Sequence, residues 1–126
     1  MSPAGQPARL LVVEDEAALA KVLQMRLQLE GFEVDVAGDG AEAMDLIRAR
    51  RPDLVVCDLM MPVMDGVEFT RAVKADPRLN AIPILILTAL KSDREIDELQ
   101  RLGAEAFASK PYDGKALTAQ IRALLA

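Results

Sequence analysis

The chain has 126 residues, 52 % of them apolar, which suits one compact domain with a buried core and is too short for two. It contains no histidine and one cysteine, so histidine-based catalysis, histidine-ligated metal sites and intramolecular disulfides are excluded. The net charge of −5 argues against direct binding to nucleic acid. No apolar run approaches the roughly 20 residues that span a membrane. We therefore expect a cytoplasmic protein.

Short apolar runs alternate with amphipathic stretches along the chain. Residues 1–8 contain proline, glycine and serine and are predicted to form a flexible leader, which leaves residues 9–126 as one domain. Three of the apolar runs are almost wholly apolar, as in strands buried on both faces of a parallel sheet, whereas the second alternates and is predicted at a sheet edge. The predicted strands are Leu10–Val13, Glu33–Val36, Leu54–Cys57, Ile84–Leu87 and Glu105–Ala108.

Helices are predicted in the gaps between these strands, each with an apolar stripe and a recognisable start or stop signal. Strands that alternate with helices indicate an α/β fold: a five-stranded parallel sheet, doubly wound with five helices in the flavodoxin-like order 2-1-3-4-5. The first helix carries the stripe Leu19, Val22, Leu23 and Leu27 and ends at Gly31, and the second begins with a capping box of Asp39 and Glu42. The third runs from Gly66 to Lys74, and the fourth runs from Ser92 to Leu102 and is stopped by Gly103. The fifth begins near Asp113.

Acidic residues follow the first and third strands directly. The first strand runs into Glu14, Asp15 and Glu16, and the third runs into Asp58. In the order 2-1-3-4-5 these two strands flank the point where strand order reverses, and open α/β sheets bind their ligands there, beyond the carboxyl ends of the strands. Three or four carboxylates are therefore predicted to converge in one crevice.

Such a cluster repels itself unless cations offset it. One candidate is Mg²⁺, which takes one or two carboxylates, several waters and phosphate oxygens. The other is Lys110, which follows the fifth strand, and Thr88 at the end of the fourth strand adds a hydroxyl. A carboxylate nucleophile, a metal platform, an ammonium and a hydroxyl together suit phosphoryl transfer, in which positioning and charge neutralisation supply most of the catalysis.

Four motifs, each at the end of a predicted strand, resemble the bacterial response-regulator receiver family of the chemotaxis-regulator type. The resemblance covers residues 9 to 125. It implies a switch of a two-component or phosphorelay system that catalyses only its own phosphorylation and dephosphorylation. The motifs are Glu14-Asp15, Asp58-Leu-Met-Met-Pro-Val-Met-Asp-Gly66, Thr88-Ala89 and Ser109-Lys110-Pro111.

The resemblance also implies how the site is used. Asp58 would take a phosphoryl group from a phosphohistidine on a sensor histidine kinase or a histidine phosphotransfer protein. Asp15 and Asp58 would ligate Mg²⁺ directly together with the backbone carbonyl of Met60, and Glu14 would act through water. Lys110 would pair first with Asp58 and then with the phosphoryl group.

The remaining implied roles concern switching. Thr88 would move to bond a phosphoryl oxygen with help from the N–H of Ala89, and Phe107 would be the rotating switch aromatic. A cis peptide bond is implied before Pro111, at the position that follows Lys110. The surface of helix 4, strand 5 and helix 5 would then control an output partner protein, from a monomer or a weak, phosphorylation-dependent dimer.

Other interpretations of single residues stay open at this point. Glu16 suits the first helical turn as well as the site, Asp65 suits a turn or cap before Gly66, and Phe107 could be a core residue. Tyr112 is left open between a rim contact and partner recognition. Packing roles are expected for Cys57, Met60, Met61 and Met64.

Three other functions compete with the phosphorylated receiver. A phosphatase of the haloacid dehalogenase type would need a second aspartate where Met60 stands, and a flavin- or nucleotide-binding module would need a Gly-rich phosphate loop where Glu14-Asp15-Glu16 stands. A receiver that acts without phosphorylation would usually lose an acidic residue or the lysine. The sequence leaves open the kinase, the pathway, the output partner, and whether the chain is a complete regulator or part of a longer protein.

Overall fold

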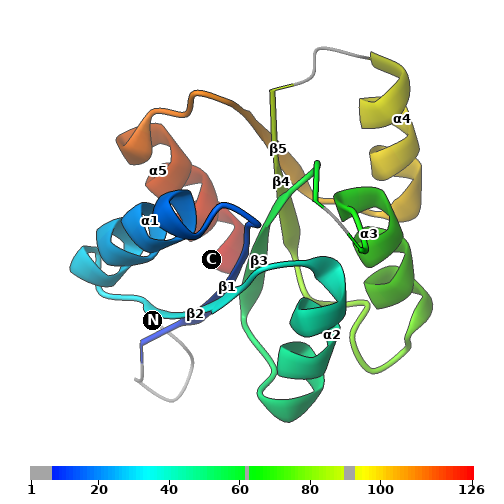
Figure 1. The fold of residues 1–126 in the computed structure, drawn as a ribbon, viewed down its shortest axis with the longest axis horizontal. Coiled ribbons are helices and arrows are strands. Elements are labelled where there is room, and N and C mark those ends of the chain that lie inside the picture. Colours follow the sequence, from blue (N-terminus) through cyan, green and yellow to red (C-terminus); the bar gives the residue numbers. More distant parts are fainter. Residues whose placement is uncertain (1–6, 62, 90–92) are drawn as a thin grey trace.

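The computed structural model describes residues 7–61, 63–89 and 93–126. Five parallel strands form one sheet in the order β2-β1-β3-β4-β5, as predicted (Figure 1). The elements are β1 (Arg9–Val13), α1 (Ala17–Leu29), β2 (Glu33–Ala37), α2 (Gly40–Ala49), β3 (Leu54–Asp58), α3 (Gly66–Ala75), β4 (Ile84–Thr88), α4 (Asp93–Leu102), β5 (Ala106–Ser109) and α5 (Gly114–Leu125).

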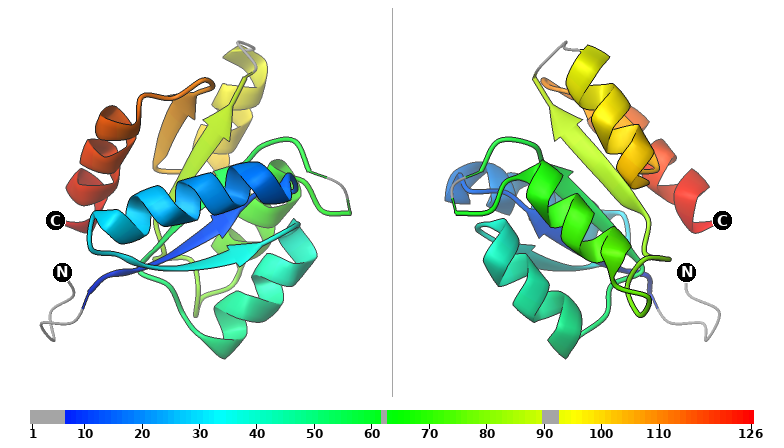
Figure 2. Two further views of the ribbon diagram at one scale, coloured as in Figure 1. Left: turned by 60° about the vertical axis from the view of Figure 1, so that its left-hand side comes forward. Right: turned by 90° about the vertical axis from the view of Figure 1, so that its right-hand side faces the viewer.

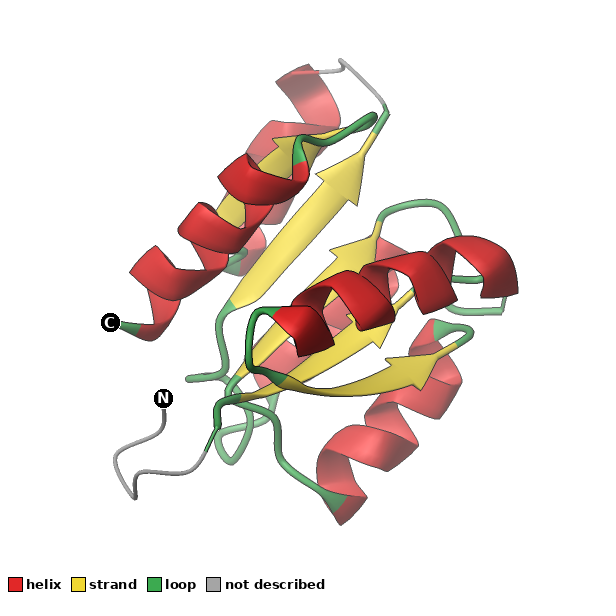
Figure 3. Ribbon diagram, turned by 90° about the vertical axis from the view of Figure 1, so that its left-hand side faces the viewer, coloured by secondary structure: helices red, strands yellow, loops and turns green. Residues whose placement is uncertain are grey.

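Helices cover both faces of the sheet, which is the doubly wound, flavodoxin-like arrangement. Helices α1 and α5 lie on one face, and α2, α3 and α4 lie on the other (Figures 2 and 3). Because successive side chains of a strand point to opposite faces, each strand contributes side chains to two hydrophobic cores, one on each face of the sheet. Leu10 and Val12 pack with α1 and α5, whereas Leu11 and Val13 pack with the opposite helices. This two-sided burial explains the continuous apolar runs of β1, β3 and β4.

The predicted strands agree with the observed ones to within one residue at every end. The alternating β2 is an edge strand, as predicted. Strand β5 is shifted by one residue at both ends and begins at Ala106, directly after Glu105. The Glu105 carboxylate accepts hydrogen bonds from the Lys74 ammonium at 2.8 Å and from the Ile84 N–H at 3.0 Å. Glu105 therefore ties α3 and the start of β4 to the base of β5.

The start and stop signals of the helices are confirmed with one correction, which concerns the capping box. Gly31 and Gly103 follow α1 and α4 at positive φ. Asp39 accepts from the Glu42 N–H at 2.9 Å, but the Glu42 carboxylate accepts from the Gly38 N–H, one residue before the cap. The reciprocal capping box lies instead at Asp65 and Glu68, where it opens α3. The predicted start of the fourth helix at Ser92 lies outside the described residues.

The apolar stripe predicted for α1 is only half buried. Leu23 and Leu27 are at most 2 % exposed, but Leu19 and Val22 are 47 % and 61 % exposed. Leu23 and Leu27 pack in the core with β1 and α5. The predicted buried face of α1 is therefore wider than the observed one. Ala8, which the sequence assigned to the leader, is 3 % exposed and its carbonyl accepts from the Glu33 N–H. Within the described ranges, no helix has the length and apolar character needed to cross a membrane.

Candidate functional site

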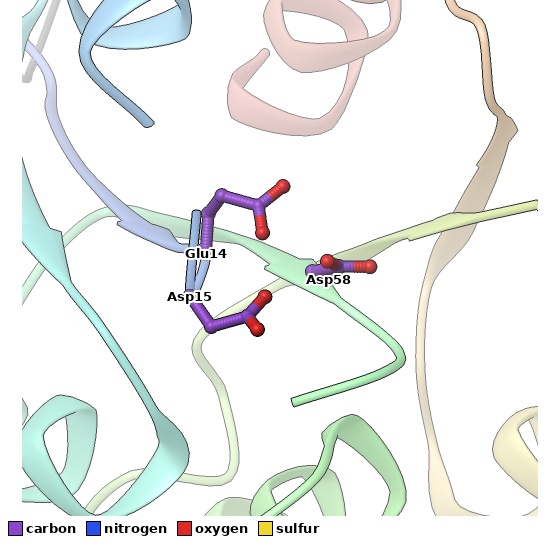
Figure 4. A group of neighbouring side chains, drawn as sticks. All are labelled: Glu14, Asp15 and Asp58. Carbon is purple, nitrogen blue, oxygen red and sulfur yellow. The ribbon is translucent and has the colours of Figure 1, made fainter. Parts of the chain in front are cut away.

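Three carboxylates meet at the carboxyl edge of the sheet (Figure 4). Asp58 ends β3, and Glu14 and Asp15 follow β1, its neighbour in the sheet. A backbone hydrogen bond of 2.9 Å from the Glu14 N–H to the Ala37 carbonyl holds the end of β1 against β2. Each of the three residues offers one carboxylate oxygen, and these atoms lie within 4.8 Å of one another. The predicted convergence is confirmed for these three, whereas Glu16 is exposed and is the N-cap of α1.

Lys110 supplies the cation of the cluster. Its ammonium lies 3.0 Å from Asp58 Oδ2 and 3.3 Å from Glu14 Oε1. The Lys110 N–H donates to the Thr88 carbonyl at 2.9 Å, which extends the pairing of β4 and β5 by one residue and aims the side chain toward β3. The peptide bond between Lys110 and Pro111 is cis, as predicted. A single ammonium thus bridges the acidic residues that follow β1 and β3.

The charges in the cluster perturb one another. Burial, followed by the hydrogen bond with Asp58, raises the pKa of Glu14 to about 7 from 4.5. Burial alone would lower the pKa of Lys110, but its hydrogen bond with Asp58 and the negative charges of Asp58 and Glu14 outweigh that effect, so the pKa of Lys110 is raised. The site therefore carries more negative charge than one ammonium neutralises, and this excess favours binding of a further cation.

This electrostatic arrangement predicts a pH-dependent stability. Because the pKa of Glu14 is raised in the folded state, its ionisation costs stability as pH rises from about 4.5 to about 7. We expect Glu14→Gln to stabilise the metal-free chain by about 1–2 kcal/mol above pH 7. This gain is smaller than the raised pKa of Glu14 alone implies, because the substitution also removes the ion pair with Lys110. Near pH 4.5 the substitution should change the free energy of unfolding little.

Urea unfolding with EDTA at about pH 5 and about pH 8 measures the effect of this substitution on stability. Glu16→Gln is the matched control, since Glu16 is exposed and adjoins the same cluster in sequence. A Glu14→Gln chain that is less stable than wild type at the higher pH would show that the Lys110 contact outweighs burial.

The donor set fits Mg²⁺, which prefers oxygen ligands. The three carboxylates supply such ligands from two adjacent strands. The loop that follows Asp58 is closed at its base by a 2.9 Å hydrogen bond from the Gly66 N–H to the Leu59 carbonyl. A Cβ on Gly66 would lie 2.9 Å from the Asp58 carbonyl oxygen, so only glycine allows α3 to approach the acceptor this closely. Met60 lies in this loop, and the metal-ligating role of its carbonyl stays a prediction.

Thr88 and Phe107 lie on neighbouring strands at the same face of the sheet. Ile86 pairs with Phe107 and Thr88 pairs with Ser109, so the side chains at 86, 88 and 107 share one face. Thr88 is 6 % exposed, and Phe107 is partly buried against the core under α2, α3 and α4. Ala89, directly after β4, is exposed. Thr88 and Phe107 are therefore placed on one face of the sheet, two residues apart along the paired strands β4 and β5.

The open interpretations of single residues are resolved in part. Asp65 is a helix cap. Cys57 is a fully buried core residue, and burial raises the pKa of its thiol. Met61 and Met64 pack against the core, whereas Met60 is 66 % exposed.

A hollow of about 620 Å³ beside the site was not predicted. Tyr112 lines it, together with Glu14, Leu19, Leu23, Leu87, Ala89, Lys110 and Pro111. The sequence gives no signal for it, because the spacing of Leu19 on α1 predicts a side chain on the buried face of the helix.

The chain resembles known proteins over most of its length. The profile of the response regulator receiver domain matches residues 10–122. The DNA-binding response regulator MtrA of Mycobacterium tuberculosis is 41 % identical over 117 residues, which cover 93 % of this chain and 50 % of that protein. The response regulator MprA of a Mycobacterium species is 42 % identical over 119 residues, covering 94 % and 51 %. The chain thus spans about half the length of the curated relatives it matches.

Solved structures show the same fold. A putative response regulator from Chloroflexus aurantiacus superposes with a TM-score of 0.90 at 31 % identity, covering 95 % of this chain and 98 % of that one. The chemotaxis protein CheY4 of Vibrio cholerae gives a TM-score of 0.89 at 32 % identity, covering 94 % and 98 %. The chain therefore belongs to the response regulator receiver domain family and is a receiver domain of two-component signalling.

Proposed function

We propose that this receiver takes a phosphoryl group on Asp58 from a phosphohistidine of a sensor histidine kinase or a histidine phosphotransfer protein, in the cytoplasm and with Mg²⁺. The observation that carries the proposal is the contact of 3.0 Å between Asp58 Oδ2 and the Lys110 ammonium inside a cluster of three carboxylates. A nucleophile, its counter-ion and a set of metal donors thus lie together at the switch point of the sheet.

The proposed reaction at Asp58 is a single displacement at phosphorus. A carboxylate oxygen attacks the phosphorus and forms the O–P bond, while the P–N bond to the histidine breaks and its electron pair returns to the imidazole nitrogen. Lys110, already bonded to Asp58, stays close enough to pair with the incoming phosphoryl oxygens. Positioning and charge neutralisation account for most of such a reaction, and both are supplied by fixed strand ends.

Mg²⁺ would be held by Asp15, Asp58 and the carbonyl of Met60, with Glu14 acting through water. When bound, the metal supplies positive charge for the phosphoryl oxygens. The buried Glu14, whose pKa is raised to about 7 mainly by burial, supports this assignment because a bound cation would stabilise its ionised form. No second acidic residue stands at position 60, so the site favours a phosphoacceptor over a phosphatase that acts on an external substrate.

Phosphorylation would switch the surface formed by α4, β5 and α5. Thr88 would bond a phosphoryl oxygen, assisted by the N–H of Ala89, and Phe107 would follow it inward. The shared sheet face of Thr88 and Phe107 supports this coupling. The DNA-binding activity in the name of MtrA belongs to a protein about twice as long. For this chain we propose that the switched surface contacts a partner protein, from a monomer or a weak phosphorylation-dependent dimer.

The proposed function predicts phosphorylation by a small donor. Acetyl phosphate with Mg²⁺ should add one phosphoryl group to the wild-type chain, measured by intact mass. EDTA should suppress the reaction, and Asp15→Ala should behave as the EDTA-treated chain does, because both remove the positive charge that the phosphoryl oxygens need. Equal rates with Mg²⁺, with EDTA and in Asp15→Ala would refute a metal-assisted acceptor site.

A further inference from the structure

The hollow of about 620 Å³ beside the acceptor has one charged end, and the rest of its lining is mainly apolar. Glu14 and Lys110 form the charged end, and the Lys110 ammonium lies 3.0 Å from Asp58 Oδ2. The other described residues that line the hollow carry no charge, namely Leu19, Leu23, Leu87, Ala89, Pro111 and Tyr112. A molecule in this hollow therefore meets a cation beside Asp58 and apolar surface along the rest of its length.

The fold holds the walls of the hollow in place. The hollow lies between α1 and the segment that joins β5 to α5, on the face of the sheet that carries both helices (Figure 2). Leu23 and Leu87 form its floor and are at most 3 % exposed, as parts of the core beneath. A Cβ on Gly114 would collide with the Arg26 guanidinium, so only glycine lets this side chain of α1 lie against the start of α5. The two helices are thus kept a side chain apart, and the hollow is preformed.

The upper part of the hollow is also of low polarity. Leu19 lines it from α1 and is 47 % exposed, so its apolar side chain is only partly used in packing within the chain. Tyr112 lines it from the opposite side and is partly buried. Burial raises the pKa of the Tyr112 phenol, although the charges of Arg26 and Lys110 act in the opposite direction. These surroundings favour an apolar group over a charged one.

The position of the hollow matches the leaving group of one class of small phosphodonor. In an acyl phosphate whose phosphorus approaches Asp58, the bridging oxygen lies on the far side of phosphorus and the acyl chain extends beyond it. Lys110 is shared by the acceptor cluster and the hollow, so an acyl chain can lie in the hollow while the phosphoryl group stays at Lys110. An acetyl group brings a single methyl group, whereas a longer chain can leave water against the apolar walls.

We propose that the hollow binds the acyl chain of acyl phosphates, so that this receiver accepts phosphoryl groups from donors with an apolar chain in preference to acetyl phosphate; this inference rests on the function proposed above. An Asp58 carboxylate oxygen forms the bond to phosphorus, while the bond between phosphorus and the bridging acyl oxygen breaks. The electron pair of that bond leaves with the carboxylate of the free acid. No proton transfer or redox partner is needed.

The first test compares butyryl phosphate with acetyl phosphate, each with Mg²⁺ and well below saturation. Their leaving carboxylates are nearly equal in basicity, so the ratio of the two initial rates reports binding of the chain and not reactivity at phosphorus. Each fully buried CH₂ group is worth about fourfold, and the hollow is open on one side, so butyryl phosphate should react about fivefold faster. Equal rates in the wild-type chain would overturn the proposal.

Variants on α1 show where the chain binds. Leu19→Asn replaces an apolar side chain of the hollow by a polar one and should lower the ratio of rates to about one. Val22→Asn is the matched control, since Val22 is exposed on the same helix and is not among the residues that line the hollow. It should keep the wild-type ratio. The ratio cancels effects on the acceptor or on the folded fraction, so a wild-type ratio in Leu19→Asn would contradict the assignment.

Tyr112 provides a readout that does not depend on phosphoryl transfer, because the chain has one tyrosine and no tryptophan. Phosphonates in which CH₂ replaces the bridging oxygen of the two donors cannot transfer their phosphoryl group. The longer one should change the Tyr112 fluorescence with a midpoint at about fivefold lower concentration. Equal midpoints would overturn the proposed chain site. If neither acyl phosphate modified the wild-type chain, the proposed function would be refuted, whereas unequal midpoints would still support binding of the chain in the hollow.

Discussion

Replacing Asp58 with asparagine is expected to abolish phosphorylation by acetyl phosphate, with a fall in the initial rate of about 1,000-fold or more. The amide is a poor nucleophile, and it also lacks the charge that holds the Lys110 ammonium at 3.0 Å. Glu14 and Asp15 remain in the cluster, so the metal donors are reduced but not removed. The loss should therefore be larger than that caused by any other single substitution in the site.

The measurement is the initial rate of mass increase at saturating Mg²⁺, with the modified residue mapped by peptide analysis. Asp45→Asn is the matched control, since Asp45 is an exposed aspartate on α2, away from the cluster. Its rate should equal that of wild type. An Asp58→Asn chain that still forms an acid-stable, alkali-labile phosphate at the wild-type rate would show that another carboxylate is the acceptor.

The fold was predictable because its strongest signals are local and periodic. The runs that form β1, β3 and β4 are apolar at successive positions, and only strands covered on both faces tolerate this pattern in a domain of this size. Glycines predicted the ends of α1 and α4, and the cap at Asp113 predicted the start of α5. The order of the strands followed from alternation and the common doubly wound topology, rather than from any single residue.

The composition of the cluster was predictable for a related reason. Parallel strands deliver their carboxyl ends to one edge, so residues distant in sequence, such as Glu14, Asp58 and Lys110, are brought together by topology alone. Their side-chain contacts were not predictable. That Lys110 bonds Glu14 as well as Asp58, and that burial raises the pKa of Glu14, depend on how deeply each strand end is covered.

Contacts between segments that are distant in sequence gave no sequence signal. Nothing in the sequence indicates that Glu105 accepts from Lys74, or that Gly40 leaves room for the Met64 carbonyl. The left-handed conformation of Val63 is the clearest case, because valine is among the residues least expected there. The predicted burial of Leu19 and Val22 on α1 was wrong for a different reason. An amphipathic stripe shows which side of a helix faces the core, but not how wide a face the neighbouring elements cover.

Replacing Thr88 with alanine is expected to separate phosphorylation from switching. The phosphoryl group adds about two negative charges and strong acceptor oxygens near the end of β4. A switch shifts only if the phosphoryl group interacts more strongly with one state than with the other. The Thr88 hydroxyl supplies part of that difference in the proposed mechanism, whereas Asp58, Lys110 and the metal donors carry the chemistry. The rate of phosphorylation should therefore stay within about threefold of wild type, while the structural response is lost.

Saturation with beryllofluoride, which mimics the phosphoryl group, allows the structural response to be measured without turnover. In wild type the environment of Phe107 and the amide exchange of α4 should both change, since Thr88 and Phe107 share one face of the sheet beside that helix. Thr88→Ala should bind beryllofluoride without either change. Thr70→Ala, a buried threonine of α3 outside the proposed switch surface, is the matched control and should respond like wild type. If Thr88→Ala responds fully at demonstrated occupancy, the Thr88 hydroxyl does not couple the acceptor site to α4 and β5, and Lys110 becomes the remaining candidate for that coupling.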